Sequence, residues 1–236
     1  ATILGAALQV DEVWIWTDVD GLMTADPRVE PSAKTISVIS FSEAMEMAYF
    51  GAKAMHPRAL EPASERGIPI RVKNTLNPDS LGTLIVQEPQ VKPESVVKTV
   101  AMIGNVALIT VSGAGMVGAP AIAAKVFSVL GESSIDVLMV SQSSSQANIS
   151  FVVPRTSLEK AVNTLELSLL GSGFVKDVTS EMGICIVAVV GAGMKGTPGV
   201  AARIFKAVAD QGVNIRMIAQ GSSELNISFV VEESGG

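Results

Sequence analysis

In the first part of the chain, up to about residue 92, short continuous apolar runs alternate with segments whose apolar residues recur at the spacing of a helix. Apolar residues spaced three and four apart at the start predict an amphipathic helix, and the run Val-Trp-Ile-Trp at 13–16 predicts a buried strand. Ser40 and Glu43 have the spacing of a capping box, which predicts that a helix begins there. A second helix is expected at 57–66, followed by a strand at 68–72.

The second half of the chain is governed by an internal repeat. Gly-Ala-Gly-Met at 113–116 recurs at 191–194, an offset of 191 − 113 = 78 residues. Between 111–153 and 189–231, 20 of 43 residues are identical, which identifies a duplication. These two segments are called the first and the second copy, and 113–116 and 191–194 are called glycine turn 1 and glycine turn 2.

Each copy predicts the same order of elements. A strand (107–112 or 184–190) leads into the glycine turn, a helix begins near Pro120 or Pro198, and two strands joined by a short polar segment form an antiparallel hairpin. A helical apolar spacing at 157–170 completes β-α-β-β-α-β in the first copy. The second copy reaches residue 236 before a matching helix and strand, so we expect it to be incomplete or to borrow its last elements.

The segment 87–94 contains two prolines and is the predicted linker between the two halves. We therefore expect three domains, at 1–88, 95–180 and 181–236.

Composition bears on partners and location. The net charge is −6 and the Lys and Arg residues form no cluster, so no nucleic-acid partner is expected. Mean hydropathy is +0.43. No run of about 18 uncharged apolar residues occurs, so no membrane span is expected. The one cysteine, Cys185, lies in an apolar run and predicts an inert core thiol in a reducing cytoplasm. The chain begins with Ala1 and lacks a signal peptide's charged start, so we expect it to be cut from a longer protein.

The stretch 17–28 leaves the carboxyl end of the first predicted strand, where open α/β sheets bind ligands. A hydroxyl and a carboxylate suit a ribose or base, a guanidinium suits phosphate, and an ammonium suits the transferred phosphate. The candidates are Thr17, Asp18, Arg28 and Lys53. An alternative stays open, in which Asp26 only holds its own turn. His56, before a proline, favours a structural role over that of a base.

Two segments resemble the signatures of aspartate kinases, namely Trp-Thr-Asp-Val-Asp-Gly-Leu-Met-Thr-Ala-Asp-Pro-Arg at 16–28 and Phe-Gly-Ala-Lys-Ala-Met-His-Pro at 50–57. The resemblance implies the C-terminal portion of an amino-acid-kinase α/β sandwich followed by two ferredoxin-like β-α-β-β-α-β (ACT) domains. It implies phosphorylation of L-aspartate to 4-phospho-L-aspartate by ATP with Mg²⁺, and no prosthetic group. The implied nucleotide-binding residues are Thr17, Asp18, Met23, Asp26, Arg28 and Lys53.

Two departures from the family qualify this expectation. Met23 stands where many relatives carry a tyrosine, although a thioether can also pack on a base or sugar. The family's Lys-Phe-Gly-Gly phosphate loop and its Arg-Gly-Gly-Ser-Asp aspartate loop would both precede residue 1. Phosphoryl transfer depends on positioning, so we expect this chain to be inactive by itself.

Both glycine turns match G-x-G-x-x-G between a strand and a helix, which is the pattern of a dinucleotide site. That site needs a parallel second strand ending in an acidic residue. Here Asp136 begins its strand, an antiparallel hairpin follows, and the second copy has Asn214 instead. We therefore do not expect dinucleotide binding.

The resemblance to tandem ACT domains implies an amino-acid effector between a strand and a helix start, where free N–H groups suit a carboxylate. The implied effector-binding residues are Met116, Gly118, Gln142 and Asn148 in the first copy and Met194, Gly196, Asn214, Ile215, Gln220 and Asn226 in the second. An equal alternative is that the asparagines only bond the hairpins.

The identity of the effector is inferred from two positions. Leu138 stands where lysine-inhibited relatives often carry an acidic residue, whereas Gln142 and Gln220 resemble threonine-sensitive members. We predict threonine, with lysine as the alternative. The resemblance also implies a homodimer or a dimer of dimers through the ACT domains. The competing hypothesis is a noncatalytic regulatory subunit, although such a chain would have little reason to keep Arg28 and Lys53.

Overall fold

The computed structural model describes residues 1–50, 55–88 and 96–235. It divides into two compact units that each combine distant stretches of the chain. Unit 1 contains Ala1–Met102, Ala188–Ala207 and Gln220–Ile227, and unit 2 contains Ile103–Val187, Val208–Ala219 and Ser228–Gly236. The units do not follow the order of the sequence, and the domain boundaries at 88, 95 and 181 stay a prediction. The linker at 87–94 lies largely outside the described residues.

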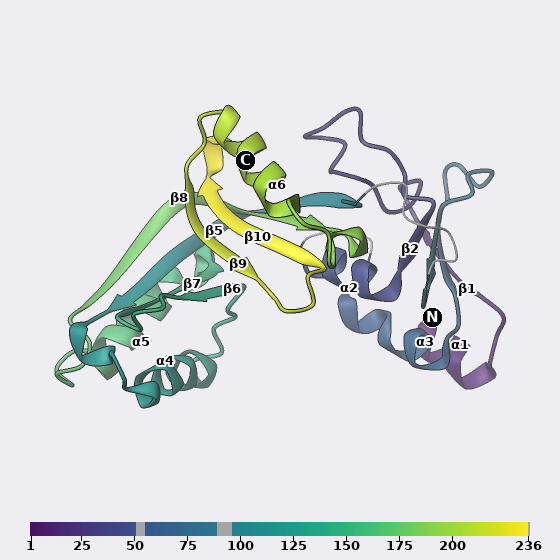
Figure 1. Cartoon of the computed structure of the whole chain (residues 1–236). Helices are drawn as coiled ribbons and strands as arrows, with labels where there is room; N and C mark the ends of the chain where they lie inside the picture. Colours follow the sequence, from purple (N-terminus) through teal and green to yellow (C-terminus); the bar gives the residue numbers. More distant parts are fainter. Residues whose placement is uncertain (51–54, 89–95, 236) are drawn as a thin grey trace. The chain divides into compact units, whose positions relative to one another are not determined.

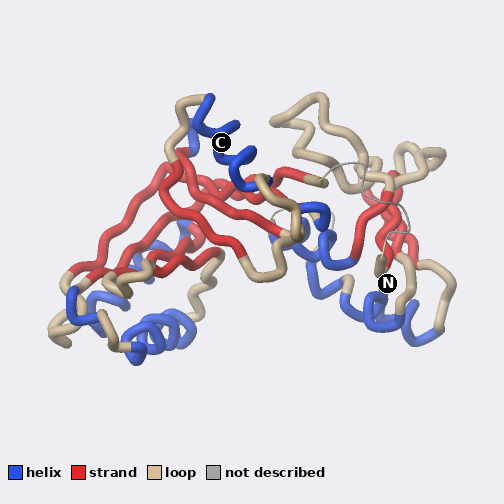
Figure 2. The backbone as a smooth tube through the Cα atoms, in the orientation of Figure 1, coloured by secondary structure: helices blue, strands red, loops and turns tan. Residues whose placement is uncertain are grey.

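The N-terminal part, residues 1–88, builds a four-stranded sheet with helices (Figures 1 and 2). Its strands are β1 (Val13–Thr17), β2 (Val38–Ser40), β3 (Ile70–Asn74) and β4 (Thr83–Val86), in the order β1-β3-β4-β2. β1 is parallel to β3 and β2 is parallel to β4, while β3 and β4 are antiparallel. The helices are α1 (Thr2–Leu8), α2 (Phe41–Tyr49), the 3-10 helix η1 (Pro57–Ala59) and α3 (Glu61–Arg66).

Local signals in this part were predicted well, with two exceptions. Ser40 and Glu43 form the predicted capping box at the start of α2, and Gly67 ends α3 in the left-handed conformation. The helix expected at 57–66 is divided into η1 and α3. The expectation that 13–16 is a buried strand is wrong, because Trp14 is 50% and Trp16 is 45% exposed. Core residues cover only one face of β1 in the described chain.

The repeats form one six-stranded sheet in the order β6-β7-β5-β8-β10-β9. Its strands are β5 (Thr99–Ser112), β6 (Met139–Gln142), β7 (Asn148–Pro154), β8 (Asp177–Val190), β9 (Ile215–Gln220) and β10 (Asn226–Glu232). The helices are α4 (Pro120–Glu132), α5 (Leu158–Leu169) and α6 (Val200–Asp210), with 3-10 helices η2 (Ala114–Met116), η3 (Arg155–Ser157), η4 (Ala192–Met194) and η5 (Glu233–Gly235). The predicted helices and the hairpin of β6 and β7 are confirmed.

Two central strands are much longer than predicted. β5 and β8 each span 14 residues, although only their second halves, 107–112 and 184–190, were expected. In the first copy, inward side chains of β5 and β7 pack on α4 and α5, which lie on the same side of the sheet (Figure 1). Phe151, Leu165 and Leu130 in this core are at most 1% exposed.

The two copies are closed by equivalent segments from different places in the chain. A Cβ on Gly113 would collide with the carbonyl oxygen of Phe174, and one on Gly191 would collide with that of Val96. The Lys176 N–H donates to Ser112 O at 2.8 Å, and the Lys98 N–H donates to Val190 O at 2.8 Å. Residues 96–98 therefore pack against the glycine turn of the second copy in the same way as 174–176 pack against that of the first. The expectation that the second copy borrows an element agrees with this arrangement.

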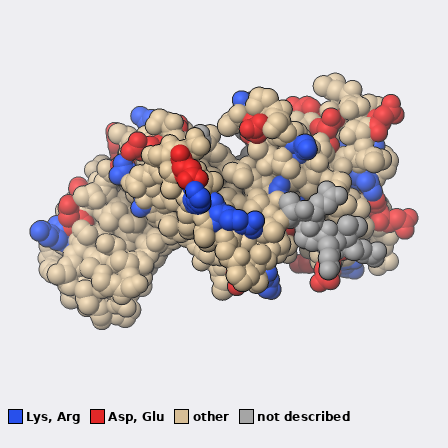
Figure 3. All heavy atoms as spheres, turned by 45° about the horizontal axis from the view of Figure 1, so that its top comes forward, with Lys and Arg blue, Asp and Glu red and all other residues tan. Residues whose placement is uncertain are grey.

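Two surface properties complete the description. No helix in the described part of the chain is long and apolar enough to cross a membrane. On the face drawn in Figure 3, acidic and basic side chains are interspersed among broad uncharged areas. Cys185 is fully buried in β8, and burial, followed by the nearby Glu233 carboxylate, raises the pKa of its thiol.

Candidate functional site

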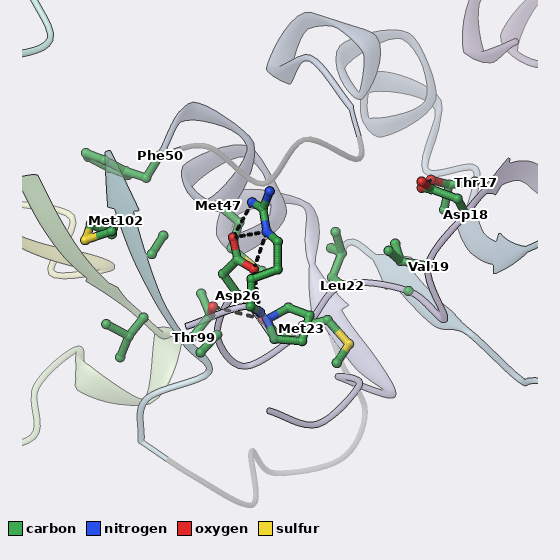
Figure 4. Close-up of a pocket in the computed structure, with 16 residues that line it drawn as sticks. Thr17, Asp18, Val19, Leu22, Met23, Asp26, Met47, Phe50, Thr99 and Met102 are labelled. Carbon is green, nitrogen blue, oxygen red and sulfur yellow. Dashed lines mark hydrogen bonds and ion pairs between the residues drawn. The ribbon is translucent and has the colours of Figure 1, made fainter. Parts of the chain in front are cut away.

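A pocket of about 450 Å³ lies in unit 1, beyond the carboxyl end of β1. Its volume is within the range of sites for ligands of nucleotide size. Figure 4 shows Thr17 and Asp18 at one end, Phe50 and Met102 at the other, and Asp26 between them. Five of the six predicted nucleotide-binding residues line it, namely Thr17, Asp18, Met23, Asp26 and Arg28. The sixth, Lys53, lies outside the described residues.

An ion pair stands in the middle of this pocket. The Arg28 guanidinium donates to both oxygens of Asp26, at 3.0 Å from Nε to Oδ1 and 2.5 Å from Nη2 to Oδ2. The hydrogen bond to Asp26 raises the pKa of Arg28 above its usual value. The Arg28 side chain is 73% exposed, so it can exchange this partner for a phosphate. Asp26 also accepts from the Arg28 backbone N–H, and so it holds its own turn as the alternative reading proposed.

The loop that carries these residues is fixed by buried hydrogen bonds. Thr83 on β4 is fully buried, and its hydroxyl accepts from Leu22 N–H at 2.8 Å and donates to Ile36 O at 2.6 Å. Asn74 donates to the Asp20 carboxylate at 2.8 Å. These contacts from β3 and β4 hold the loop against the sheet. The backbone of the loop from Thr17 to Arg28 is thus held in place before any ligand binds.

One wall of the pocket was not predicted from the sequence. Met47 of α2 and Phe50, the residue that caps the C-terminus of α2, are 3% and 5% exposed, and residues 99–102 come from the start of β5. The Thr99 hydroxyl donates to Met23 O at 3.0 Å, and Val100 N–H donates to Thr24 O at 2.9 Å. His56 accepts from the Arg58 N–H and caps η1, in agreement with its structural reading.

A second, smaller cavity of about 120 Å³ lies in the first copy, within unit 2. It is too small for a nucleotide. Met116 and Gln142 line it as predicted, together with Gln146, which was not. The Gln146 side chain accepts from the Gly118 N–H at 3.1 Å, and Gly118 is in the left-handed conformation. Asn148 is the first residue of β7, opposite Ser112 of β5, and is not among the residues that line the cavity.

The second copy differs at the equivalent positions. The Gly196 N–H donates to a Glu224 carboxylate oxygen at 2.7 Å, where the first copy uses the neutral Gln146. Asn226 donates to Glu46 of α2 at 3.1 Å. Met194 is 3% exposed, as Met116 is.

The predicted residues of the second copy do not all converge in this chain. Asn214 precedes β9 and Ile215 opens it, while Gln220 ends it. At about 3.3 Å per residue, Ile215 and Gln220 are about 17 Å apart along the strand.

The glycine turns do not have the surroundings of a dinucleotide site. Within the first copy the strand that pairs with β5 is β7, and it runs antiparallel to β5. The first two glycines of each turn instead admit a neighbouring backbone, at Phe174 in the first copy and at Val96 in the second. Close packing therefore accounts for these glycines.

Comparison with known proteins agrees with both halves of the chain. Residues 1–74 match the model of the amino acid kinase family, and residues 109–169 and 187–236 match an ACT domain. A bifunctional aspartokinase/homoserine dehydrogenase of Haemophilus influenzae is 42% identical over 99% of the chain, which covers 29% of that protein. A solved regulatory subunit of aspartate kinase from Thermus thermophilus is 34% identical, with a TM-score of 0.52, over 59% of this chain and 90% of its own.

The chain belongs to the aspartate kinase family. Solved aspartate kinases share its fold along the whole length. The enzyme of Clostridium acetobutylicum is 32% identical with a TM-score of 0.90, over 99% of this chain and 53% of its own. Aspartokinase III of E. coli, solved with aspartate and ADP, is 31% identical with a TM-score of 0.83, over 99% and 52%. This aspartate kinase chain thus spans about half of those structures and 29% of the bacterial relative.

The pocket residues that were not predicted differ in how much signal the sequence of this aspartate kinase chain carries for them. Met47 and 99–102 carry no motif and belong to a helix and a strand whose patterns indicate nothing more. Phe50 opens the 50–57 signature, but its place in the pocket was not predicted. Gln146 and Glu224 did carry a signal, because each stands 28 residues after Gly118 or Gly196 in its copy. Comparing the two copies position by position finds both of them.

Proposed function

We propose that this chain provides the nucleotide site and the amino-acid sensor of an aspartate kinase, an enzyme that phosphorylates the side-chain carboxylate of L-aspartate with ATP. The observation that carries the proposal is the pocket that gathers Thr17, Asp18, Met23, Asp26 and Arg28 beside an apolar wall. A polar end, a cation and an apolar wall match the three chemical parts of a nucleotide.

The roles of the residues follow from their chemistry. Thr17 and Asp18, which share a 3.1 Å hydrogen bond, offer a hydroxyl and a carboxylate to the nucleoside. Met23, Met47 and Phe50 supply apolar contacts for its rings. Arg28 exchanges Asp26 for the phosphates. Lys53, outside the described residues, is proposed to contact the transferred phosphate as well. Aspartate would be held by parts of the enzyme outside these 236 residues.

Magnesium fits this site only together with the nucleotide. Within the described ranges, no three His, Cys, Asp or Glu side chains form a cluster that could hold a metal ion. Mg²⁺ is commonly bound by substrate phosphates and one or two carboxylates, and Asp18 and Asp26 are the carboxylates at the pocket. Bound there, the ion would neutralise phosphate charge.

Titration of the chain with ADP and Mg²⁺ by calorimetry tests the nucleotide site. We expect binding that Arg28→Ala weakens about tenfold or more, because a charge-assisted hydrogen bond is worth about 1.5–3 kcal/mol. Arg66→Ala, a charge removed from the end of α3, should leave the affinity unchanged. An absence of binding by the unsubstituted chain, or equal affinities for both variants, would contradict the assignment.

We further propose that the cavity of the first copy binds the effector, with threonine favoured over lysine. Its lining is apolar apart from Gln142 and Gln146, and Leu138 offers no charge for a lysine ammonium. A small side chain with one hydroxyl matches two amides. Thermal unfolding with each amino acid tests this, since a ligand of the folded state raises Tm. Stabilisation by lysine and not by threonine would reverse the assignment.

Two finer points belong to the same proposal. The chain is proposed to dimerise through its ACT domains, which light scattering of the purified chain at several concentrations measures directly. The alternative of a noncatalytic regulatory subunit draws support from the likeness to the Thermus thermophilus subunit, which covers 59% of this chain. The nucleotide pocket in the N-terminal part speaks for a catalytic chain.

A further inference from the structure

Glu43 makes hydrogen bonds in two directions from the start of α2. It is 1% exposed. Its Oε2 accepts from the Ser40 N–H at 3.0 Å and the Ser40 hydroxyl at 2.9 Å, which completes the capping box. Its Oε1 accepts from the Ala192 N–H in glycine turn 2 at 2.6 Å. Both oxygens of a buried carboxylate are thus occupied, and losing either partner leaves buried charge unsatisfied.

Glycine turn 2 is also built into the core of unit 1. Val190, the residue before the turn, is fully buried and packs in the same cluster as Ile39, Ala44 and Met47 of the N-terminal part. On its other side, Gly191 and Gly193 touch the backbone at Val96 so closely that neither position has room for a Cβ. The turn therefore cannot shift without moving α2 or residues 96–98.

Both neighbours of the turn continue into the wall of the nucleotide pocket. α2 leads from Glu43 to Met47 and Phe50, which line the pocket. Residues 96–98 lead directly into 99–102, which line it as well. Glycine turn 2 thus contacts α2 directly, and it contacts the backbone at Val96, three residues before the part of β5 that lines the pocket. Met47, Phe50, Thr99 and Met102 of this wall are labelled in Figure 4.

We propose that Glu43 is a positioning residue that couples glycine turn 2 to the nucleotide pocket. It does not touch the nucleotide, and the proposal rests on the proposed nucleotide site. The Ala192–Glu43 bond holds α2 in the position at which Met47 and Phe50 complete the pocket. A change of the turn that breaks the bond lowers nucleotide affinity, and by reciprocity bound nucleotide favours the bonded turn.

The repeat provides a matched pair of variants. Ala192→Pro removes the N–H that Glu43 accepts, at the first residue of a 3-10 helix where proline is tolerated. The preceding Gly191 has ψ 129°, which suits a residue before proline. Ala114→Pro is the same change in the first copy, where Gly113 has ψ 137° and, among the described residues, no carboxylate accepts from the Ala114 N–H.

Calorimetric titration of each variant chain with ADP and Mg²⁺ is the test. We expect Ala192→Pro to weaken binding about tenfold, within the usual range of coupling between sites, and Ala114→Pro to change it less than about twofold. Glu43→Gln, which leaves one acceptor oxygen where the carboxylate had two, should act in the same direction as Ala192→Pro, and the double variant should lose less affinity than the two single effects added together, because both change the same contact. Glu61→Gln, an exposed acid in the first turn of α3, is its control.

The outcomes separate the inference from the proposed function. Nucleotide binding by the unsubstituted chain with equal affinities for Ala192→Pro and Ala114→Pro would overturn the coupling and leave the nucleotide site standing. If the unsubstituted chain binds no nucleotide, the proposed function fails, and hydrogen exchange of the α2 amides decides the coupling. Faster exchange in 41–50 for Ala192→Pro alone would support it, and equal exchange would overturn it. Should Ala192→Pro not fold, Glu43→Gln against Glu61→Gln makes the same comparison.

Discussion

Replacing Gly191 by alanine tests why glycines recur in the two glycine turns. The φ of Gly191 is 172°, an extended conformation that alanine adopts without strain, so any effect comes from space. The added Cβ would collide with the Val96 carbonyl oxygen and lie 3.0 Å from Lys98 N. Both are backbone atoms, which cannot rotate away as a side chain can. Residues 96–98 must therefore separate from the turn.

The cost can be estimated from what this separation breaks. The hydrogen bond from Lys98 to Val190 contributes about 1 kcal/mol, and overpacking a tight contact costs about 1–3 kcal/mol. We expect Gly191→Ala to lower the free energy of unfolding by about 2–4 kcal/mol. Urea unfolding followed by the fluorescence of Trp14 and Trp16, which both lie in unit 1, measures it.

Gly131→Ala is the control for this substitution. Gly131 lies within α4 with open space around its Cα, so alanine should stabilise the chain by up to about 1 kcal/mol through its higher helix propensity. Urea unfolding followed by circular dichroism reports this change. If Gly191→Ala alters stability by less than about 0.5 kcal/mol, packing does not explain the glycines, and the dinucleotide reading of the G-x-G-x-x-G pattern regains its basis.

Three further predictions concern single side chains. Glu224→Gln gives the second copy the amide of the first and should raise its threonine affinity, whereas Gln146→Glu should lower that of the first copy, as calorimetry would detect. The pKa of Glu12 is lowered from 4.5, chiefly by its hydrogen bond from Arg71, so this pair stabilises the fold above pH 4.5 and the contribution is lost as pH falls through the lowered pKa. In Glu12→Gln, the free energy of unfolding measured with urea should therefore fall less steeply as the pH is lowered below 5. An unchanged pH profile would contradict this. Cys185, buried and with a raised thiol pKa, should react with a thiol reagent at neutral pH only as fast as the chain unfolds, and labelling without urea at the rate of a free thiol would contradict this.

Much of the fold was predictable because its signals are local. The capping box at Ser40, the left-handed glycine after α3 and the hairpin of β6 and β7 each depend on a few neighbouring residues. Because the two copies are similar in sequence, the β-α-β-β order predicted for one copy also applied to the other. That residues between Thr17 and Arg28 gather at one pocket was predictable for the same reason, since they are contiguous and leave one strand, while their binding of a nucleotide stays a prediction.

The rest depends on partners that are distant in sequence. Nothing in residues 99–102 indicates that they belong to a pocket wall, because their partners Met23 and Thr24 precede them by more than 70 residues. The first half of β5 was missed for this reason. Trp14 and Trp16 were assigned to a buried strand on hydrophobicity alone, which does not tell whether one face or both are covered.

The segment 96–102 belongs both to the second copy and to the wall of the pocket in unit 1. Its first residues close the second sensor copy against Gly191 and Gly193, and its last residues line the nucleotide pocket. The copy it closes begins about 90 residues later in the chain, so the first copy is inserted between the two parts of the second. In the part of the chain that the structure describes, no further helix or strand lies between glycine turn 2 and the segment that continues into the pocket wall. A ligand that displaces the turn would therefore move that segment directly. The coupling proposed between glycine turn 2 and the nucleotide pocket therefore rests on chain topology and on the hydrogen bond that Glu43 accepts from Ala192.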